Sequence, residues 1–513
     1  MKIKDYFGNF AINTNHNNIK MKKLFISAAI SLFCTSFIFA NEGNPKREFR
    51  GAWLHTVHQG QYAKMTTEET QTYLCEQLDL LQEAGCNAVV FQVRPSADAF
   101  YPSELEPWSR FLTGAAGKAP YPVWDPLQFM IDACHDRGME LHAWLNPYRV
   151  TTSKGEKLPA NHIYHKHPER FVTYDNKLYF DPGIPENREF IISVVKDIIT
   201  RYDVDAVHMD DYFYPYPIPG QEFPDSKSFK QYGGTMKRDD WRRKNVDMLI
   251  EGLHKMIVAE KPWVRLGISP FGIWRNKEND PRGSETRGLQ NYDALYADVL
   301  LWTEKGWVDY MLPQLYWELE KKVASSEILA HWWNDNANGR HMYIGQDVKI
   351  TMDKPDVAPS TDVNQLDHKI RLSRELPDIQ GNCWWPGYMI TSNYKGIAEA
   401  LAEKLQSTVA IVPSYPWIDN IAPDEVAALR QNGDELVWKA PATDDVMQMA
   451  RAYVVYRFEA EETPDINNAE AIAGITYEPS FELADNDRGC TFIITVLDRA
   501  NNESAKGVAI IIK

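Results

Sequence analysis

Eight short apolar runs alternate with longer helical patterns between residues 50 and 405. The runs span residues 51–55, 88–94, 141–146, 206–210, 266–271, 310–317, 342–347 and 383–386. Strand patterns that alternate with helical patterns indicate repeated βα units and a parallel sheet. Eight such units predict an α/β fold, a (β/α)8 TIM barrel with long loops. An open doubly wound sheet is the alternative, but no glycine-rich phosphate loop follows the first run.

Apolar residues at helical spacing mark the segments between these runs. Residues 66–84 place Leu74, Leu78 and Leu81 on one face, and Gly85 follows as a stop signal. The same kind of pattern recurs at residues 126–137, 188–202 and 239–260. We expect these helices to cover the outside of the barrel.

The character of the sequence changes at about residue 408. Prolines 413, 416 and 423 predict a linker, and short alternating runs follow at 435–438, 452–458, 490–496 and 507–513. About 100 residues of short strands separated by turn signals predict a β-sandwich. Trp438, residues 453–458 and residues 498–502 resemble a fibronectin type III module. We therefore predict a barrel domain over residues 41–407 and a fibronectin type III-like spacer or docking module over 408–513.

The N-terminal region has the pattern of a secretory leader. A basic start at 21–23 precedes an apolar stretch that ends at Ala40, which predicts a signal peptide over residues 21–40. Residues 1–20 are polar and rich in Asn, and we interpret them as a non-native extension before a true start at Met21. A lipoprotein acylated at Cys34 is the alternative, although Phe33 is bulky for that processing step. We expect an exported protein of the periplasm or cell envelope.

Composition narrows the possible partners. The formal net charge of -16 argues against nucleic acid or an anionic membrane surface as the main partner. The 16 Trp, 25 Tyr and 21 Phe are numerous, and aromatic side chains at strand ends suit stacking against sugar rings. No other stretch approaches the roughly 18 apolar residues of a membrane-spanning helix. We expect a monomer that acts on a polysaccharide.

Polar and aromatic side chains recur where the predicted strands end. Because strand residues alternate faces, side chains of one parity point into the barrel and toward its mouth. This parity groups Gln92 with Arg94, His142 with Trp144 and Asn146, His208 with Asp210 and Tyr212, Gln314 with Tyr316 and Glu318, and adds Asp347 and Trp385. Each of them alone could be a satisfied core group, with Arg94 paired to an acid and His142 hydrogen-bonded internally. Their convergence on one face favours a functional cleft.

Asp210 and Asp211 are the candidate catalytic residues. Cleaving a glycosidic bond requires a proton donor at the leaving oxygen and a carboxylate near the developing oxocarbenium ion. Asp211 faces away from the cleft if the strand continues past it, but turns inward if the strand ends there. Adjacent carboxyl groups also separate their pKa values, so that one stays protonated. Glu318 and Asp347 are reserve partners, and a strand-end turn capped by Asp is the alternative interpretation of the pair.

A series of motifs, in order, carries a family resemblance. They span residues 50–53, 91–95, 106–109, 112–114, 125–127, 142–149, 167–169, 181–183, 208–215 and 313–317. From about Arg47 to Leu405 the sequence is similar to the glycosyl hydrolase-like 10 family of exported bacterial proteins. The resemblance implies a TIM-barrel glycoside hydrolase with the Asp-Asp pair as its catalytic motif, acting on peptidoglycan strands that have lost their stem peptides. One departure is Ala97, where the family often has Gly before the Asp.

The predicted substrate-binding residues surround the same strand ends. They are Arg94, His142, Trp144, Asn146, Tyr148, Arg149, His208, Tyr212, Tyr214, Gln314, Tyr316, Trp317, Asp347 and Trp385. Arg94, Arg149 and Arg275 could pair with the lactyl carboxylate of muramic acid, or instead balance nearby aspartates. The Tyr- and Pro-rich segment 212–219 could pack under a loop, but we interpret it as the wall of a sugar subsite.

Several alternatives remain open at this point. His162, His165 and His167 resemble a metal cluster, but nothing in the loop fixes ligand geometry, so we predict neither a metal nor another cofactor. The chain could hydrolyse another amino-sugar or plant polysaccharide, or bind glycan without turnover. An N-acetyl group on the substrate would also permit substrate-assisted catalysis, in which one Asp orients the acetamido group and the other donates a proton.

Overall fold

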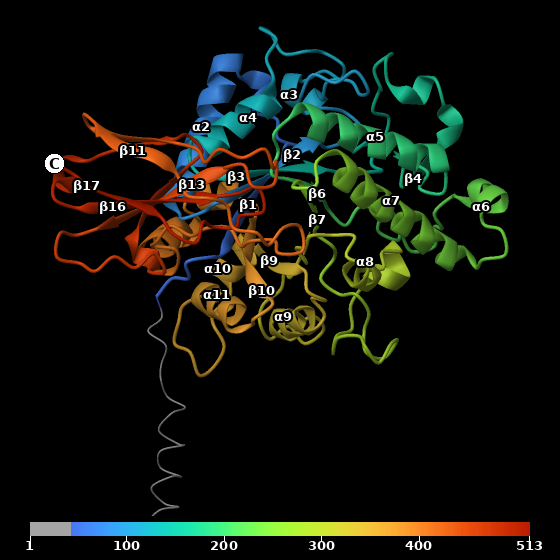
Figure 1. Ribbon diagram of the computed structural model, residues 1–513. Helices are drawn as coiled ribbons and strands as arrows, with labels where there is room; N and C mark the ends of the chain where they lie inside the picture. The colour runs from blue at the N-terminus through green and yellow to red at the C-terminus, as the bar shows by residue number, and fades with distance from the viewer. Residues whose placement is uncertain (1–42) are drawn as a thin grey trace, which may run out of the picture. The chain divides into compact units, whose positions relative to one another are not determined.

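The structure is a computed structural model that describes residues 43–513 (Figure 1). The predicted extension 1–20, the signal peptide 21–40 and Cys34 lie outside the described residues. Across residues 43–513, no helix has the length and apolar character needed to cross a membrane. The five cysteines in this part of the chain are all free thiols.

Eight parallel strands close into a barrel, which confirms the predicted (β/α)8 architecture. Each strand pairs with the next barrel strand in sequence, and the last pairs with the first. The strands are β1 (Phe49–Leu54), β2 (Ala88–Arg94), β3 (Glu140–Leu145), β6 (Ala206–Met209), β7 (Arg265–Ile268), β8 (Tyr310–Met311), β9 (His341–Asp347) and β10 (Ile379–Trp385). A hairpin of β4 (Phe171–Tyr174) and β5 (Lys177–Phe180) is inserted after β3.

Helices cover the barrel strands (Figure 1). They are α2 (Thr67–Glu83), α3 (Arg110–Thr113), α4 (Pro126–His135), α5 (Pro185–Arg201), α6 (Ser226–Tyr232), α7 (Arg238–Glu260), α8 (Val299–Glu304), α9 (Ser326–Asp335), α10 (Val348–Asp353), α11 (Leu366–Glu375), α12 (Tyr388–Thr391) and α13 (Ile397–Ala400). Short 3-10 or π turns occur at η1 (Tyr62–Lys64), η2 (Ile163–His165), η3 (Pro168–Arg170), η4 (Asn291–Leu295), η5 (Tyr394–Gly396), η6 (Leu401–Leu405), η7 (Ala469–Ala471) and η8 (Asp485–Asp487). The four helices predicted from apolar spacing are α2, α4, α5 and α7.

The predicted strand 310–317 is wrong in length, because β8 contains only Tyr310 and Met311. Pro313 has no backbone N–H to donate and interrupts the ladder. Gln314 then forms isolated bridges to Phe271 and Gly345, so the chain still follows the barrel wall.

Large side chains fill the barrel interior, and one glycine makes room for them. Phe49 and Tyr343 stack at 4.0 Å between ring centroids, and both pack beside Tyr310. A Cβ atom added to Gly267 on β7 would lie 1.8 Å from Cζ of Tyr310. A side chain at position 267 would therefore displace the Tyr310 ring from its place in the barrel interior.

Seven C-terminal strands form two antiparallel sheets, in agreement with the predicted two-sheet sandwich. One sheet contains β11 (Ala427–Asn432), β12 (Glu435–Lys439) and β15 (Ser480–Glu482), and the other contains β14 (Ile472–Thr476), β13 (Ala452–Phe458), β16 (Thr491–Leu497) and β17 (Val508–Ile511). Leu436 and Trp438 of the first sheet share a buried core with Val455 and Phe492 of the second. This shared core makes the two sheets one packed unit.

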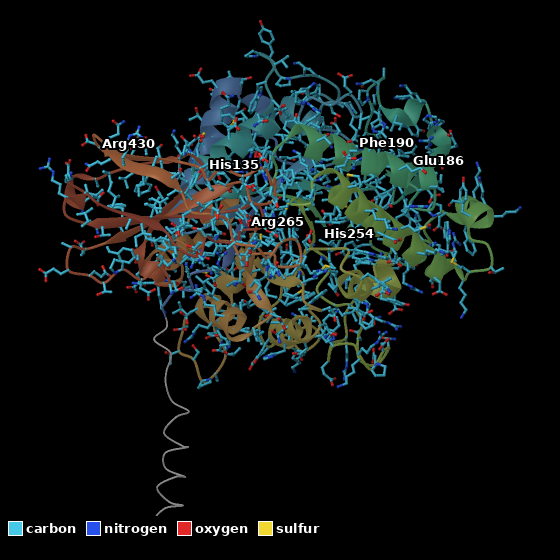
Figure 2. The ribbon with its side chains drawn as sticks, viewed as in Figure 1. His135, Glu186, Phe190, His254, Arg265 and Arg430 are labelled. Carbon is cyan, nitrogen blue, oxygen red and sulfur yellow. The ribbon has the colours of Figure 1, made fainter. Side chains whose placement is uncertain are left out.

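Ion pairs that include buried Asp205 join these sheets to the barrel. Arg451, at the start of β13, donates to Asp203 at 2.5 Å and to Asp205 at 2.8 Å, and Asp205 also contacts His135. The intervening segment is packed as well, since the Tyr415 hydroxyl lies 2.6 Å from that of Tyr343. Figure 2 shows His135 beside the C-terminal strands. Residues 44–513 thus form one compact unit, rather than a barrel with a spacer on a linker.

We expect Arg451→Met to lower the free energy of unfolding by about 3 kcal/mol, because it leaves buried Asp205 with less charge compensation. Urea denaturation of the full chain measures this change. Arg430→Met is the matched control, since Arg430 lies on β11 and forms no ion pair within residues 43–513 (Figure 2). Equal losses in both variants would contradict the prediction, as would separate unfolding of barrel and sheets in the wild type.

Candidate active site

A cavity of about 450 Å³ opens where the barrel strands end. Its lining residues are Trp53, Val57, His58, Gln92, Trp144, Arg149, Asp210, Asp211, Tyr212, Ser269, Gln314, Tyr316 and Trp385. They come from the C-terminal ends of seven strands or from the loops that follow them. This is the end at which TIM barrels place their chemistry.

Asp210 lies just past β6, and N–H donors fix its carboxyl group. Its Oδ2 atom accepts hydrogen bonds from Trp144 Nε1 at 3.1 Å and from Asn146 Nδ2. Its Oδ1 atom accepts a longer bond, 3.3 Å, from the backbone N–H of Tyr212. Both lone pairs of Oδ2 are therefore occupied, which makes Oδ1 the oxygen that is free to carry a proton.

Asp211 also lines the cavity, because β6 ends at Met209 and the chain turns there. This is the second of the two arrangements considered from the sequence. Its Oδ2 atom accepts a hydrogen bond from the Tyr216 hydroxyl. Both aspartates are buried.

Burial and mutual repulsion perturb both acids. Burial, and after it the charge of Asp211, raise the pKa of Asp210 to about 7, against the opposing charge of Arg149. Burial also raises the pKa of Asp211 to about 6, although hydrogen bonds from Tyr216 and Gln314 oppose this shift. Near neutral pH the pair therefore contains a carboxyl group beside a carboxylate.

A chain of amides of fixed direction orients Asn146 behind Asp210. The backbone N–H groups of Thr56 and Val57 donate to Gln92 Oε1 at 2.9 Å, and such groups can only donate. Gln92 Nε2 must then donate to Asn146 Oδ1, at 2.6 Å. Asn146 consequently presents its Nδ2 atom to Asp210.

Arg149 places a cation at the cavity wall. Its guanidinium donates to Pro95 O and Asn146 Oδ1 and lies 5.4 Å from the centroid of the Tyr212 ring. No carboxylate within residues 43–513 lies at ion-pair distance from this group. A charged ligand group can therefore pair with it.

Indole and phenol rings form the floor of the cavity. Trp53 contacts Tyr316 and Trp385 edge-to-face, with 6.4 Å between ring centroids in each pair, and Trp144 contacts Trp385 at 6.1 Å. Tyr212 is 39% exposed at the rim. Flat apolar surfaces of this kind suit the apolar faces of sugar rings.

Comparison with known proteins agrees with this geometry. The sequence profile described as Glycosyl hydrolase-like 10 matches residues 48–358. The chain belongs to the glycosyl hydrolase-like 10 family. It is 39% identical over 500 residues to glycosyl hydrolase YngK of Bacillus subtilis (strain 168), covering 94% of this chain and 97% of that protein.

A second relative is glycosyl hydrolase DigH of Escherichia coli (strain K12). It is 38% identical over 363 residues, covering 65% of this chain and 81% of DigH. Among solved structures, the glycoside hydrolase domain of PgaB (BpsB) from Bordetella bronchiseptica is similar at 10% identity, with a TM-score of 0.45, covering 69% of this chain and 98% of that one. The protein is a glycoside hydrolase, as its family and relatives show.

Nine of the predicted site residues lie at the cleft or directly behind it. Trp144, Arg149, Asp210, Asp211, Tyr212, Gln314, Tyr316 and Trp385 line the cavity, and Asn146 is buried behind Asp210. The roles of these residues in binding and catalysis remain predictions.

Arg94 does not reach the cavity, contrary to the prediction. In the register, two residues of β2, Val93 and Arg94, are opposed by Leu145 alone on β3, and such a bulge redirects the side chain. The guanidinium is fully buried and pairs with Glu106 at 2.6 and 2.7 Å. Sequence parity cannot anticipate a bulge.

The other predicted contacts also lie outside the cavity, for local reasons. His142 and His208 are buried in the barrel interior below the floor, because they precede the strand ends. Loops cover Tyr148 and Tyr214 completely. Asp347 caps α10 through the N–H of Ile350.

The remaining candidates have partners of their own. Trp317 packs edge-to-face on Phe271, Arg275 pairs with Asp293 and Asp280, and Glu318 lies within ion-pair distance of Lys321 and Lys354. His162 Nδ1 accepts from the N–H of Tyr164, whereas His165 and His167 contact Leu158 O and Glu169. Residues 43–513 contain no cluster of three His, Cys, Asp or Glu side chains suited to a metal.

Five lining residues were not among the predicted site residues. Strand alternation places Gln92 on the mouth-facing parity without a binding role, and the same alternation applied to the first strand could have identified Trp53. Val57, His58 and Ser269 belong to loops or strand ends whose direction no periodicity reports.

We expect Asp210→Asn to stabilise the protein at pH 8 by about 2 kcal/mol and to have little effect near pH 4. The raised pKa means that the folded state binds this proton more tightly than the unfolded state does, so the wild type loses stability as the pH rises toward 7. Asn mimics the protonated form and removes that loss.

Denaturant unfolding at several pH values measures the effect of Asp210→Asn. The control is Asp175→Asn, on a half-exposed aspartate that lies between β4 and β5 and pairs with Lys177. An Asp210→Asn effect that does not vary with pH would contradict the proton assignment.

Proposed function

We propose that this glycoside hydrolase is exported to the periplasm or cell envelope and cleaves peptidoglycan strands that lack stem peptides. The observation that carries the proposal is the buried Asp210–Asp211 pair beside the unpaired cation of Arg149. Export rests on the leader pattern of residues 21–40. We expect N-terminal sequencing of the mature protein to begin at Asn41. Acylation at Cys34 would appear instead as a lipid-bearing N-terminus.

In the proposed mechanism, Asp210 donates its Oδ1 proton to the glycosidic oxygen as the bond breaks. Asp211, which accepts from Tyr216, remains the carboxylate and stabilises the positive charge that develops at the anomeric carbon. A water molecule then bonds to the anomeric carbon, and the proton that it releases returns to the acid pair. Trp144 and Asn146 hold Asp210 in place throughout, because their N–H groups bind its other oxygen.

Arg149 supports the proposed substrate class. Muramic acid carries a free lactyl carboxylate once its peptide is removed, and this anion is absent from simple N-acetylglucosamine polymers. Because Arg149 Nη1 has no partner within residues 43–513, it can donate to such a carboxylate. The aromatic floor accepts the sugar rings on either side.

The C-terminal module has a structural role in this proposal. Its three-stranded and four-stranded sheets support a fibronectin type III-like sandwich, as the sequence resemblance implies. We infer that this module completes the base of the barrel and that the whole chain acts as a monomer.

Digestion of peptidoglycan sacculi, with and without prior removal of stem peptides by an amidase, tests the function. We expect wild-type protein to release disaccharide-type fragments, by mass, only from the stripped glycan, and Asp210→Asn to reduce the rate by at least about a hundredfold. Fragments released from chitin oligosaccharides but not from stripped glycan would assign another amino-sugar polymer. Full activity of the Asn variant would show that Asp210 is not the acid.

Arg149→Gln should raise KM for stripped glycan roughly tenfold with little change in kcat, because it removes a charge-assisted hydrogen bond to the lactyl group. Glycan whose lactyl carboxylates have been reduced to alcohols should show no difference between wild type and variant. Arg275→Gln is the matched control, since Arg275 already pairs with Asp293 and Asp280. A KM change that persists on reduced glycan would contradict carboxylate recognition.

A further inference from the structure

Five side chains, Glu140, His142, Tyr310, His208 and Ser269, form a continuous series of hydrogen bonds from the base of the barrel to the cleft. We call this series the file. Glu140 Oε2 lies 3.0 Å from His142 Nε2, and His142 Nδ1 lies 2.8 Å from the Tyr310 hydroxyl. The same hydroxyl lies 3.0 Å from His208 Nδ1, and His208 Nε2 lies 2.9 Å from Ser269 Oγ. All five side chains are buried, and Ser269 lines the cavity.

The base of the file fixes its direction. Glu140 Oε1 accepts from Arg265 at 2.8 Å and from Asn501 of the C-terminal module at 2.9 Å. The carboxylate can only accept, so His142 Nε2 carries a hydrogen. Because Arg265 already balances the charge of Glu140, a neutral ring satisfies every contact, and its Nδ1 atom then accepts from the Tyr310 hydroxyl.

The cleft end fixes the same direction independently. Trp53 Nε1 lies 3.4 Å from His208 Nε2, and an indole N–H can only donate. His208 therefore accepts at Nε2 and carries its hydrogen on Nδ1, which donates to the Tyr310 oxygen. The single hydroxyl hydrogen of Tyr310 is thus directed to His142, as the base requires. Burial lowers the pKa of His208 well below its ordinary value, which keeps the ring neutral.

We propose that His208 is a positioning residue for glycoside hydrolysis, held by this file as the Nδ1-protonated tautomer so that Nε2 anchors Trp53 and Ser269 on the cleft floor. Ser269 Oγ lies 2.9 Å from His208 Nε2 and 3.5 Å from Met209 O, so its hydrogen is directed to the nearer His208 and its oxygen lone pairs are left for a sugar hydroxyl. Ser269 is the principal donor to the single lone pair of Nε2, and Trp53, at 3.4 Å, is the weaker one. The inference rests on the cleft of the proposed function. Through the file, Asn501 of the C-terminal module supports the cleft floor from the base of the barrel.

Glu140→Gln tests the inference, because a change at the base of the barrel reverses the donor–acceptor direction of every hydrogen bond from residue 140 to His208. Arg265 and Asn501 require an acceptor, so the new side chain turns its NH2 group toward His142 Nε2. His142 then carries its hydrogen on Nδ1 and donates to Tyr310, whose hydroxyl donates to His208 Nδ1. His208 then carries its hydrogen on Nε2, so that this N–H group and the N–H group of Trp53 point at each other.

Asp205→Asn is the matched control. Asp205 is a second buried carboxylate at the base, bound to His135, Arg451 and the N–H of Leu141, and it is outside the file. Both variants should lower the melting temperature. Long-range 15N–1H spectra of protein labelled in histidine identify the tautomer of His208, whose signals disappear in His208→Asn.

We expect an Nδ1-protonated His208 in the wild type and in Asp205→Asn, and an Nε2-protonated ring in Glu140→Gln. We also expect kcat/KM to fall roughly tenfold in Glu140→Gln relative to Asp205→Asn, because an opposed N–H group is left unsatisfied at the floor. Tyr310→Phe, which keeps the ring and removes the shared hydroxyl, should lower kcat/KM similarly.

An Nε2-protonated His208 in the wild type would overturn the inference, as would equal kcat/KM in Glu140→Gln and Asp205→Asn. The spectra need no substrate, and kinetics use whichever glycan the wild type hydrolyses. Failure of the peptidoglycan assignment therefore remains distinguishable from failure of this inference.

Discussion

Two carboxyl groups buried side by side at the end of β6 are an unfavourable arrangement, and the cleft is built around compensating for it. Removing an ionised carboxylate from water costs several kcal/mol unless donors replace the lost hydration. Trp144, Asn146, Tyr216 and the backbone of Tyr212 supply those donors. Retention of one proton by the pair lowers the remaining cost and, in the proposed function, provides the acid for glycoside hydrolysis.

Two hydrogen-bonded chains of fixed direction support this arrangement from different sides. One begins at the backbone N–H groups that bind Gln92 and ends at Asp210. The other begins at Glu140 and ends at Ser269. In both, one end is a group that can act only as donor or only as acceptor, so every intermediate amide, imidazole or hydroxyl has one allowed orientation. The cleft is preorganised because orientation is fixed in parts of the barrel that substrate never touches.

The sequence predicted the barrel and the location of the acid pair, because both depend on local patterns. Strand parity correctly placed Trp144 of β3 at the cavity, and Asp210 and Tyr316 line the cavity although they lie past the ends of β6 and β8. It failed at Arg94, where a bulge breaks the alternation, and at Tyr148 and Tyr214, where loops cover side chains that lie near strand ends. It also missed the partners of Arg94 and Arg275, since ion pairing between loops leaves no periodic signal.

The same limit applies to the C-terminal region. Proline-rich composition predicted a linker, yet Tyr415 is buried against the barrel, because pairing with residues hundreds of positions away decides packing there. Strand existence could be predicted from alternation, but docking could not.

The contacts at the barrel base also set the order in which the molecule can mature. Arg451 lies 246 residues beyond Asp205, and Asn501 lies 361 residues beyond Glu140. In a chain that emerges N-terminus first, both acids can meet His135, His142 and Arg265 early, but their C-terminal partners Arg451 and Asn501 are added only when nearly the whole polypeptide has emerged. The set of contacts that supports the cleft floor is therefore complete only when synthesis of the chain is almost finished.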